Sequence, residues 1–166
     1  MKKLCLAILL AGLAATQAFA DFSDGVFAYA KGEYDQAFNT MRSLAETSDH
    51  GLAQYYVAMM YLRGNGVEQS YEEAAIWFRK SAEQRVKQAQ YRLAELYMKG
   101  RGVPKDYEYA YAWYRVGAEH RHKKSLDALT AASANLSPAE LEEAQKLSRK
   151  LIRDYGPKEE EPQANN

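Results

Sequence analysis

The stretch GNGVEQSYEEAAIWF at residues 64–78 recurs as GRGVPKDYEYAYAWY at residues 100–114. An alignment of residues 53–88 with residues 89–124 needs no gap and contains 17 identities in 36 positions. Internal similarity at a fixed period of this size is the signature of a repeat architecture. The chain is therefore predicted to consist of stacked copies of one structural unit.

Both halves of each repeat have the spacing of an amphipathic helix. In the first half, small and apolar residues follow at intervals of four, one and three positions, which places them on one helical face. The second half has a similar stripe, in which alanines alternate with aromatic residues. The matched positions are Ala53, Val57, Ala58, Tyr61, Tyr71, Ala74, Trp77, Phe78 and Ala82 in the first copy, and Ala89, Leu93, Ala94, Tyr97, Tyr107, Ala110, Trp113, Tyr114 and Ala118 in the second.

Two closely spaced glycines separate the halves in each copy, Gly64 and Gly66 in the first and Gly100 and Gly102 in the second. Glycine ends a helix readily because it accepts the left-handed backbone that other residues resist. Each unit is thus predicted to be a helix, a compact loop and an antiparallel helix. One such hairpin cannot bury its apolar face alone, so neighbouring copies are expected to stack.

The alanine, tyrosine, G-x-G-V and A-x-x-W-Y positions of both copies resemble the pattern of the Sel-1-like repeat family, which is related to the tetratricopeptide repeats. The resemblance implies an all-α fold, a right-handed α/α superhelical solenoid of stacked antiparallel hairpins. It also implies work as an adaptor or scaffold. Arg85 and Arg121 stand where the family usually has a glycine, so the turn between repeats is expected to be less sharply specified.

The resemblance, together with the composition of the C-terminal part, divides the chain into segments. They are a tetratricopeptide-like hairpin at 21–52, two full repeats at 53–88 and 89–124, a degenerate repeat with a C-terminal capping helix at 125–156, and a disordered tail at 157–166. Ser137 and Glu140 form a predicted capping box that opens the last helix. About eight helices are expected, at 22–31, 34–47, 51–62, 71–84, 87–98, 107–120, 123–133 and 137–155.

The first twenty residues have the pattern of a cleaved secretory signal peptide. Lys2 and Lys3 precede a short apolar stretch, and Ala18-Phe19-Ala20 is a small-x-small cleavage site. The apolar stretch is too short for a membrane span. The sequence therefore predicts a periplasmic or secreted protein that does not span the membrane.

Cleavage would remove Cys5, the only cysteine, so that no catalytic or metal-binding thiol remains. It would also leave 20 basic and 22 acidic residues, a net charge of about −2, which gives no reason to expect a nucleic-acid partner.

No catalytic or phosphate-binding motif is present, and the chain is predicted to be neither an enzyme nor a cofactor-binding protein. The glycines of GNGV follow a helix and lack the strand that a dinucleotide fingerprint requires. His120 and His122 lie beside Arg121, Lys123 and Lys124, and such positive charge opposes a bound metal ion. A solvated basic turn between repeats is the better interpretation of this cluster, which could also meet an anionic partner surface.

A partner surface is expected on the first helix of each repeat, which the resemblance places on the inner, concave side of a solenoid. Large residues there lie off the repeated stripe and are of types enriched at protein interfaces. The predicted partner-binding residues are Tyr55, Met59, Leu62 and Arg63 in the first repeat, and Tyr91, Arg92, Glu95 and Met98 in the second.

Alternatives remain for the role of the two tyrosines and for the function of the protein. Tyr55 and Tyr91 occur in both repeats, so they could instead pack against the neighbouring repeat. The predicted partner is a peptide segment or helix of another protein bound during envelope, secretion or motility-related assembly. Cell-wall or exopolysaccharide glycan is the alternative ligand, and a hydrolase acting on cell-wall compounds is a remoter one. The sequence does not specify an oligomeric state.

Overall fold

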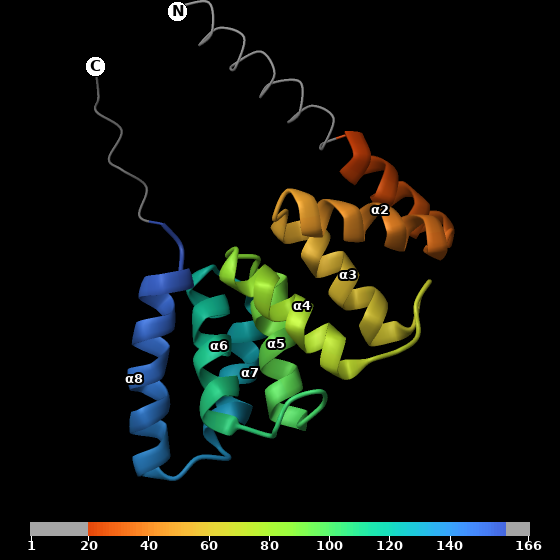
Figure 1. Ribbon diagram of the computed structural model, residues 1–166. Coiled ribbons are helices and arrows are strands. Elements are labelled where there is room, and N and C mark those ends of the chain that lie inside the picture. Colours follow the sequence, from red (N-terminus) through yellow and green to blue (C-terminus); the bar gives the residue numbers. More distant parts are fainter. Residues whose placement is uncertain (1–19, 159–166) are drawn as a thin grey trace, which may run out of the picture. The chain divides into compact units, whose positions relative to one another are not determined.

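The computed structural model describes residues 20–158, and these residues form helices and no strand (Figure 1). The helices are one at residues 20–31, followed by α2 (Tyr34–Thr47), α3 (Gly51–Arg63), α4 (Tyr71–Glu83), α5 (Lys87–Lys99), α6 (Tyr107–Glu119), α7 (Lys123–Ser133) and α8 (Pro138–Tyr155). The limits of α2 to α8 and the end of the first helix lie within two residues of the predicted ones, so the all-α prediction is confirmed. The predicted signal peptide, apart from Ala20, lies outside the described residues. So does the predicted tail from residue 159 onward.

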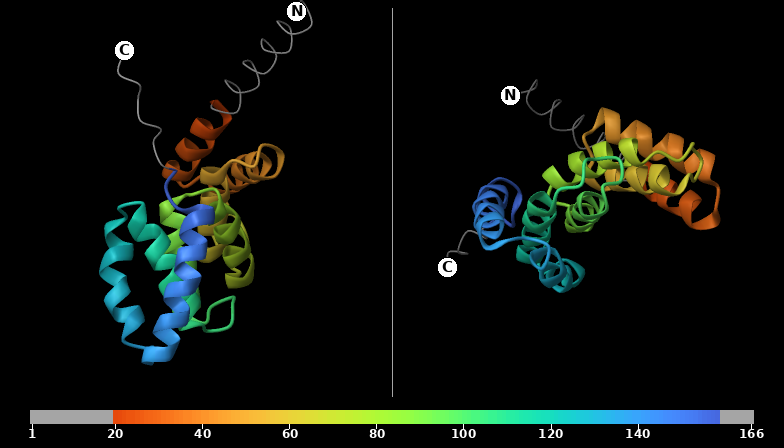
Figure 2. Two further views of the ribbon diagram at one scale, coloured as in Figure 1. Left: turned by 90° about the vertical axis from the view of Figure 1, so that its left-hand side faces the viewer. Right: turned by 90° about the horizontal axis from the view of Figure 1, so that it is seen from below.

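The chain divides into two compact units, which meet in sequence between Trp77 and Phe78, within α4. Unit 1 ends at Trp77 and contains α2 packed against α3, with Met41, Val57 and Met60 fully buried. Unit 2 begins at Phe78 and contains α5 to α8. Its central helix is α6, which packs against α5, α7 and α8 (Figure 2).

The two glycine-containing loops are closed by the same backbone hydrogen bond. Ser70 donates its amide to the carbonyl of Tyr61, and Asp106 donates to Tyr97, both at 3.1 Å. The same two residues then cap the helix that follows, because the Ser70 hydroxyl accepts from the Glu73 amide and the Asp106 carboxylate accepts from the Tyr109 amide. Serine and aspartate are both good N-caps, so the two loops keep the same structure although this residue differs between them.

The turns between hairpins share an unusual backbone conformation. Asp49, Arg85 and Arg121 have φ values of 49°, 62° and 55°, and they are the non-glycine residues with positive φ among those described. They recur every 36 residues, so the period extends one turn upstream of the two full repeats. The prediction of a less sharply specified turn at Arg85 and Arg121 was wrong: the backbone keeps the left-handed conformation although the side chain costs energy there.

Arg121→Gly is therefore expected to stabilise unit 2 by about 0.5–1 kcal/mol, since relief of left-handed strain exceeds the backbone entropy that glycine loses on folding. Chemical denaturation followed by circular dichroism measures the change. Arg85→Gly is the control with the opposite sign, because Arg85 also donates hydrogen bonds to the carbonyls of Gly156 and Asp154, both at 3.0 Å. Destabilisation by Arg121→Gly would contradict the strain argument.

Helix α8 closes unit 2 by packing on α6. Its start has the predicted capping box, in which the Ser137 hydroxyl accepts from the Glu140 amide and the Glu140 carboxylate accepts from the Ser137 amide. These hydrogen bonds hold the pKa of Glu140 below its usual value. At the other end, Tyr155 stacks on Trp113 with ring centroids 5.7 Å apart. Its carbonyl is 3.1 Å from Gln90 Nε2 and also 3.1 Å from His120 Nε2.

Candidate functional site

The candidate site in unit 2 is centred on Tyr91, a half-buried residue of α5. Its ring centroid lies 5.3 Å from that of His122, at the start of α7, and 5.7 Å from that of Tyr114, on α6. The guanidinium carbon of Arg92 lies 5.7 Å from the centre of the Tyr91 ring. Three helices thus contribute to one aromatic cluster that is covered only in part. Tyr91 is therefore in contact with neighbouring aromatic rings and is also partly exposed.

Glu95 links this cluster to the charged surface of α5. Its carboxylate accepts a 2.7 Å hydrogen bond from Arg92 and lies 3.4 Å from the Lys99 ammonium, while its side chain is only 20% exposed. Burial, and next the charge of Glu95, raise the pKa of both Tyr91 and Tyr114. Both phenols stay protonated at neutral pH; the Tyr91 hydroxyl donates a hydrogen bond to Glu95, and Tyr114 is buried. Of the four residues predicted in this repeat, three are thus brought together, and Met98 is half-buried one turn further along α5.

His122 lies in a setting that disfavours its charged form. Burial lowers its pKa first, and the positive charges of Lys87, Lys124 and Arg92 lower it further. Its Nδ1 is 2.9 Å from the hydroxyl of the buried Ser125. Because it neighbours Tyr91, the imidazole belongs to the candidate site.

We expect the protein to lose stability when the pH is lowered, because the unfolded chain binds a proton at His122 more readily than the folded chain does. The folded-state pKa of His122 lies below the ordinary value of 6.5, so the unfolded chain binds more protons as the pH falls below that value. The His122 contribution is complete above about pH 6.5 and is lost below it. The melting temperature at about pH 7.5 and about pH 5.5 is the measurement, for the wild type and for His122→Asn.

His122→Asn should lose less stability between these pH values than the wild type. His50→Asn serves as a control for changing a helix N-cap, since both histidines occupy that position. Equal losses in the wild type and in His122→Asn would contradict the assignment.

The corresponding surface in unit 1 is also aromatic. Tyr55 lies edge-on to Tyr56 with ring centroids 5.9 Å apart, and Tyr56 lies 5.5 Å from Tyr29. The Arg63 guanidinium donates a 3.0 Å hydrogen bond to the hydroxyl of Tyr29. Tyr55 and Leu62 are half-buried and Arg63 is exposed, so three of the four residues predicted in this repeat reach the surface.

Met59 does not, and here the sequence interpretation needs a correction. Its side chain is 6% exposed, so it belongs to the core of unit 1 together with the fully buried Met60. The residue that aligns with Met59 in the second repeat is the charged Glu95, and that difference suggested a surface position for Met59. Methionine is unbranched and polarisable, and it fills irregular space in a core without following the stripe of smaller residues.

Sequence reasoning missed several residues of these clusters, among them Tyr56, Tyr114 and His122. Tyr56 aligns with Arg92 of the second repeat, so it is not a position that the two repeats share. Tyr114 lies on the repeated core stripe, and His122 was interpreted as part of a solvated turn. The proximity of Tyr91 to His122 arises from the packing of α6 against both α5 and α7, and no local spacing signals it.

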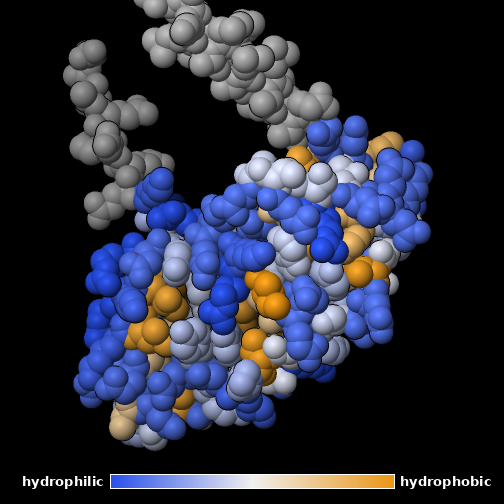
Figure 3. Space-filling view, in the orientation of Figure 1, coloured by the Kyte–Doolittle hydropathy of each residue, from blue (hydrophilic) through white to orange (hydrophobic). Residues whose placement is uncertain are grey.

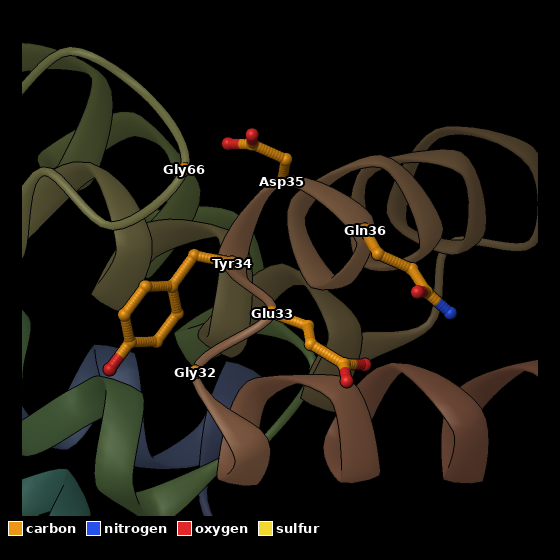
Figure 4. Close-up of a pocket in the computed structure, with 6 residues that line it drawn as sticks. All are labelled: Gly32, Glu33, Tyr34, Asp35, Gln36 and Gly66. Atoms are coloured by element: carbon orange, nitrogen blue, oxygen red, sulfur yellow. The ribbon is translucent and has the colours of Figure 1, made fainter.

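An open hollow of about 480 Å³ surrounds the start of α2 in unit 1, between Gly32 and Gly66. Figure 4 shows that Glu33, Asp35 and Gln36 point in different directions around it. Small-molecule sites have a few polar groups that converge on the ligand. The hollow is therefore a weaker candidate than the Tyr91 cluster.

Hydrophobic side chains form only small groups on the face seen in Figure 3. Among residues 20–158, no cluster of three or more histidine, cysteine or acidic side chains is suited to hold a metal ion. None of the helices described is both long and apolar enough to cross a membrane.

Comparison with known proteins identifies one family, and fifteen chains of solved structures match, of which two are described here. The model of the Sel1 repeat matches residues 51–86 and 87–122, which is the predicted period with limits two residues earlier. One structure is a protective antigen present in uropathogenic Escherichia coli strains, described as displaying an SLR fold. It is 27% identical with a TM-score of 0.80, and the match covers 92% of this chain and 36% of the antigen.

The second structure is a Sel1 repeat protein from Oxalobacter formigenes. It is 29% identical with a TM-score of 0.63, and the match covers 80% of this chain and 55% of that one. The chain thus spans about a third of the first structure and about half of the second. No curated protein matches the chain. The two likenesses confirm the predicted fold class, a solenoid of stacked helix hairpins.

Proposed function

We propose, from the premise that this chain carries two Sel1 repeats, that it is a non-catalytic interaction module that binds a peptide segment or helix of a partner protein on the exposed face of α5. Sel1 repeat proteins generally mediate protein–protein interaction and are generally not catalysts. The partner, the site on α5 and the cellular setting are the specific content of the proposal.

The observation that carries the proposal is the partly covered aromatic cluster at Tyr91. Aromatic and arginine side chains are enriched in binding hot spots because they bury a large area and keep a polar end for hydrogen bonding. Tyr91 and Arg92 are both half-buried and lie 5.7 Å apart in the geometry of a cation over a ring. The ion pairs of Glu95 with Arg92 and Lys99 hold these side chains in place before a partner arrives, which reduces the entropy lost on binding.

The experiment is a cross-linked capture of partners from the native cell envelope, with wild type, Tyr91→Ala and Arg92→Glu as baits. Arg115→Glu is the matched control: Arg92 and Arg115 are half-buried, and each pairs with a glutamate, at 2.7 Å and 2.8 Å. The expected result is one protein enriched by the wild type and by Arg115→Glu, and lost with both α5 variants. Unchanged capture by the α5 variants would place the partner elsewhere and refute the site.

Export to the periplasm or the exterior is also part of the proposal, and it rests on the signal pattern of residues 1–20. Mass spectrometry of the protein recovered from the envelope tests it. We expect a mature chain that begins at Asp21, whereas an intact N-terminus in a cytoplasmic fraction would reject export. Assembly of envelope, secretion or motility machinery is the setting that we propose for an exported adaptor.

Binding of a cell-wall or exopolysaccharide glycan is the second candidate, and the aromatic cluster of unit 1 favours it. The cluster contains Phe22, Tyr29, Tyr34, Tyr55 and Tyr56, and Tyr34 is 38% exposed. Saturable binding of purified glycan that is lost in Tyr55→Ala, without capture of any protein, would support this candidate over the first.

A further inference from the structure

We propose that the partner segment is acidic and that its carboxylates dock on a basic edge of unit 2 formed by Lys87, Arg121, Lys123 and Lys124. This inference rests on the proposed function, because it names the chemistry of the segment that the α5 face binds. The four residues are called the basic edge below.

The basic edge borders the Tyr91 cluster. Lys87 is the first residue of α5, Lys123 and Lys124 open α7, and Arg121 lies in the turn before it. His122 sits among them, and its ring is 5.3 Å from that of Tyr91. Lys87 and Lys124 are close enough to shift the pKa of His122 by their charge. A segment lying over Tyr91 would therefore pass beside these cations.

The four cations of the basic edge have no acidic side chain paired with them among the described residues. All four side chains are exposed, and none forms an ion pair within residues 20–158. By contrast, Arg92, Arg115 and Lys146 each pair with a glutamate at 2.7–2.8 Å. The whole chain has equal numbers of basic and acidic residues, so the basic edge is a local concentration of charge.

Their placement is also unfavourable for the helices themselves. The amino end of a helix carries partial positive charge and is stabilised by acidic residues. Helices α2, α4, α6 and α8 have an acidic residue in the first turn, whereas α5 and α7 have none and begin with lysine. Neither α5 nor α7 has a side-chain cap at its start. An acidic ligand would relieve this repulsion on binding.

An acidic peptide fits this surface better than a nucleic acid. Nucleic-acid binding draws on several phosphate contacts along a continuous basic surface. Here Glu95, itself an anion, lies on the same face, and the rings of Tyr91 and His122 offer area for apolar side chains. A segment with both carboxylates and apolar or aromatic side chains matches the two chemistries together.

The acidic run Glu159–Glu161 of this chain is the competing occupant. The Tyr155 carbonyl is 3.1 Å from His120 Nε2, so the chain leaves α8 near the turn that contains Arg121. The run follows Gly156 by only a few positions in the sequence, so it could compete with a partner segment of the same charge. The test therefore has to separate this run from a partner.

The experiment measures fluorescence anisotropy with a labelled peptide of alternating glutamate and tyrosine, and with a matched peptide that has glutamine in place of glutamate. The full mature chain is compared with Lys123→Glu/Lys124→Glu. Arg149→Glu/Lys150→Glu on α8 is the control, because it reverses an adjacent pair of exposed cations that also lack ion pairs among the described residues. Glutamate at the start of α7 favours the helix, so the first variant is expected to fold.

The expected result is binding of the acidic peptide that weakens with salt and that falls at least about tenfold in Lys123→Glu/Lys124→Glu but not in the control. Equal binding of the glutamine peptide, or an equal loss in the control, would overturn the proposal. Tighter binding of duplex DNA than of the peptide would overturn it as well. Binding seen only after Glu159, Glu160 and Glu161 are changed to glutamine would assign the basic edge to the chain's own acidic run.

The outcome also separates this inference from the function on which it rests. If an envelope protein is captured, is lost with Tyr91→Ala and is kept by Lys123→Glu/Lys124→Glu, the α5 site stands and the basic edge is rejected. If the acidic peptide binds as expected but no envelope protein depends on Tyr91, the basic edge stands and the proposed function fails.

Discussion

Trp113→Ala is expected to destabilise unit 2 by about 3–5 kcal/mol, which is the usual cost of truncating a buried tryptophan. The side chain is 1% exposed, and its ring stacks on Tyr155. The substitution would leave a cavity beside α6, which is the helix that α5, α7 and α8 all contact. Domains of this size are stable by roughly 5–15 kcal/mol, so the variant would be close to unfolding. Urea denaturation followed by the helical circular dichroism signal measures the loss.

Trp113→Phe is the informative control. The indole Nε1 is buried and has no hydrogen-bond partner among residues 20–158. Phenylalanine therefore removes apolar area without breaking a hydrogen bond, and we expect it to lose less than half of the stability that alanine loses. A loss of under about 1 kcal/mol for Trp113→Ala would show that the ring faces solvent.

Gly66→Ala is expected to destabilise unit 1 by about 3 kcal/mol, from two causes that add. The residue has φ of +69°, which costs energy for any residue with a Cβ. In addition, a Cβ placed there would lie 2.4 Å from the carbonyl oxygen of Tyr34, which is backbone and cannot rotate away. Figure 4 shows the loop of Gly66 facing the backbone at the start of α2. The measurement is the midpoint of thermal unfolding together with the unfolding free energy.

Gly32→Ala separates the two causes. Gly32 has φ of +82°, but a Cβ there would meet nothing within 4 Å. We expect a loss of about 1–2 kcal/mol from the left-handed backbone alone. If both alanine variants lose the same stability, the close approach of Gly66 to Tyr34 contributes nothing, and the packing of this loop on α2 would need revision.

The local structure of the repeats could be predicted because it depends on neighbouring residues. The glycine pairs, the stripes of small and aromatic residues and the capping box of Ser137 and Glu140 each act within a few positions of the chain. The helix limits accordingly lie within two residues of the predicted ones. The turns at Arg85 and Arg121 are the exception, because the preceding hairpin imposes a left-handed backbone that the local residue disfavours.

The candidate site was predicted less completely. Tyr91, Arg92 and Glu95 follow from subtracting the core stripe, and the structure shows them in contact. Met59 was misplaced because only the apolar positions shared by both repeats were assigned to the core. A flexible side chain next to that face can still be buried. Tyr114 and His122 could not be found by spacing, since they come from two other helices.

The sequence by itself determined the repeat, its helices and loops, and the class of solenoid, because these depend on short-range spacing and on stacking of equal units. Only the tertiary structure decided which surplus residues are exposed, that Tyr91 meets His122 and Tyr114, and that Lys87 lies near the imidazole of His122. Those relations join residues separated by 20 or more positions through the packing of α5, α6 and α7. No local pattern encodes such distances, since each helix could rotate or shift and keep its own periodicity.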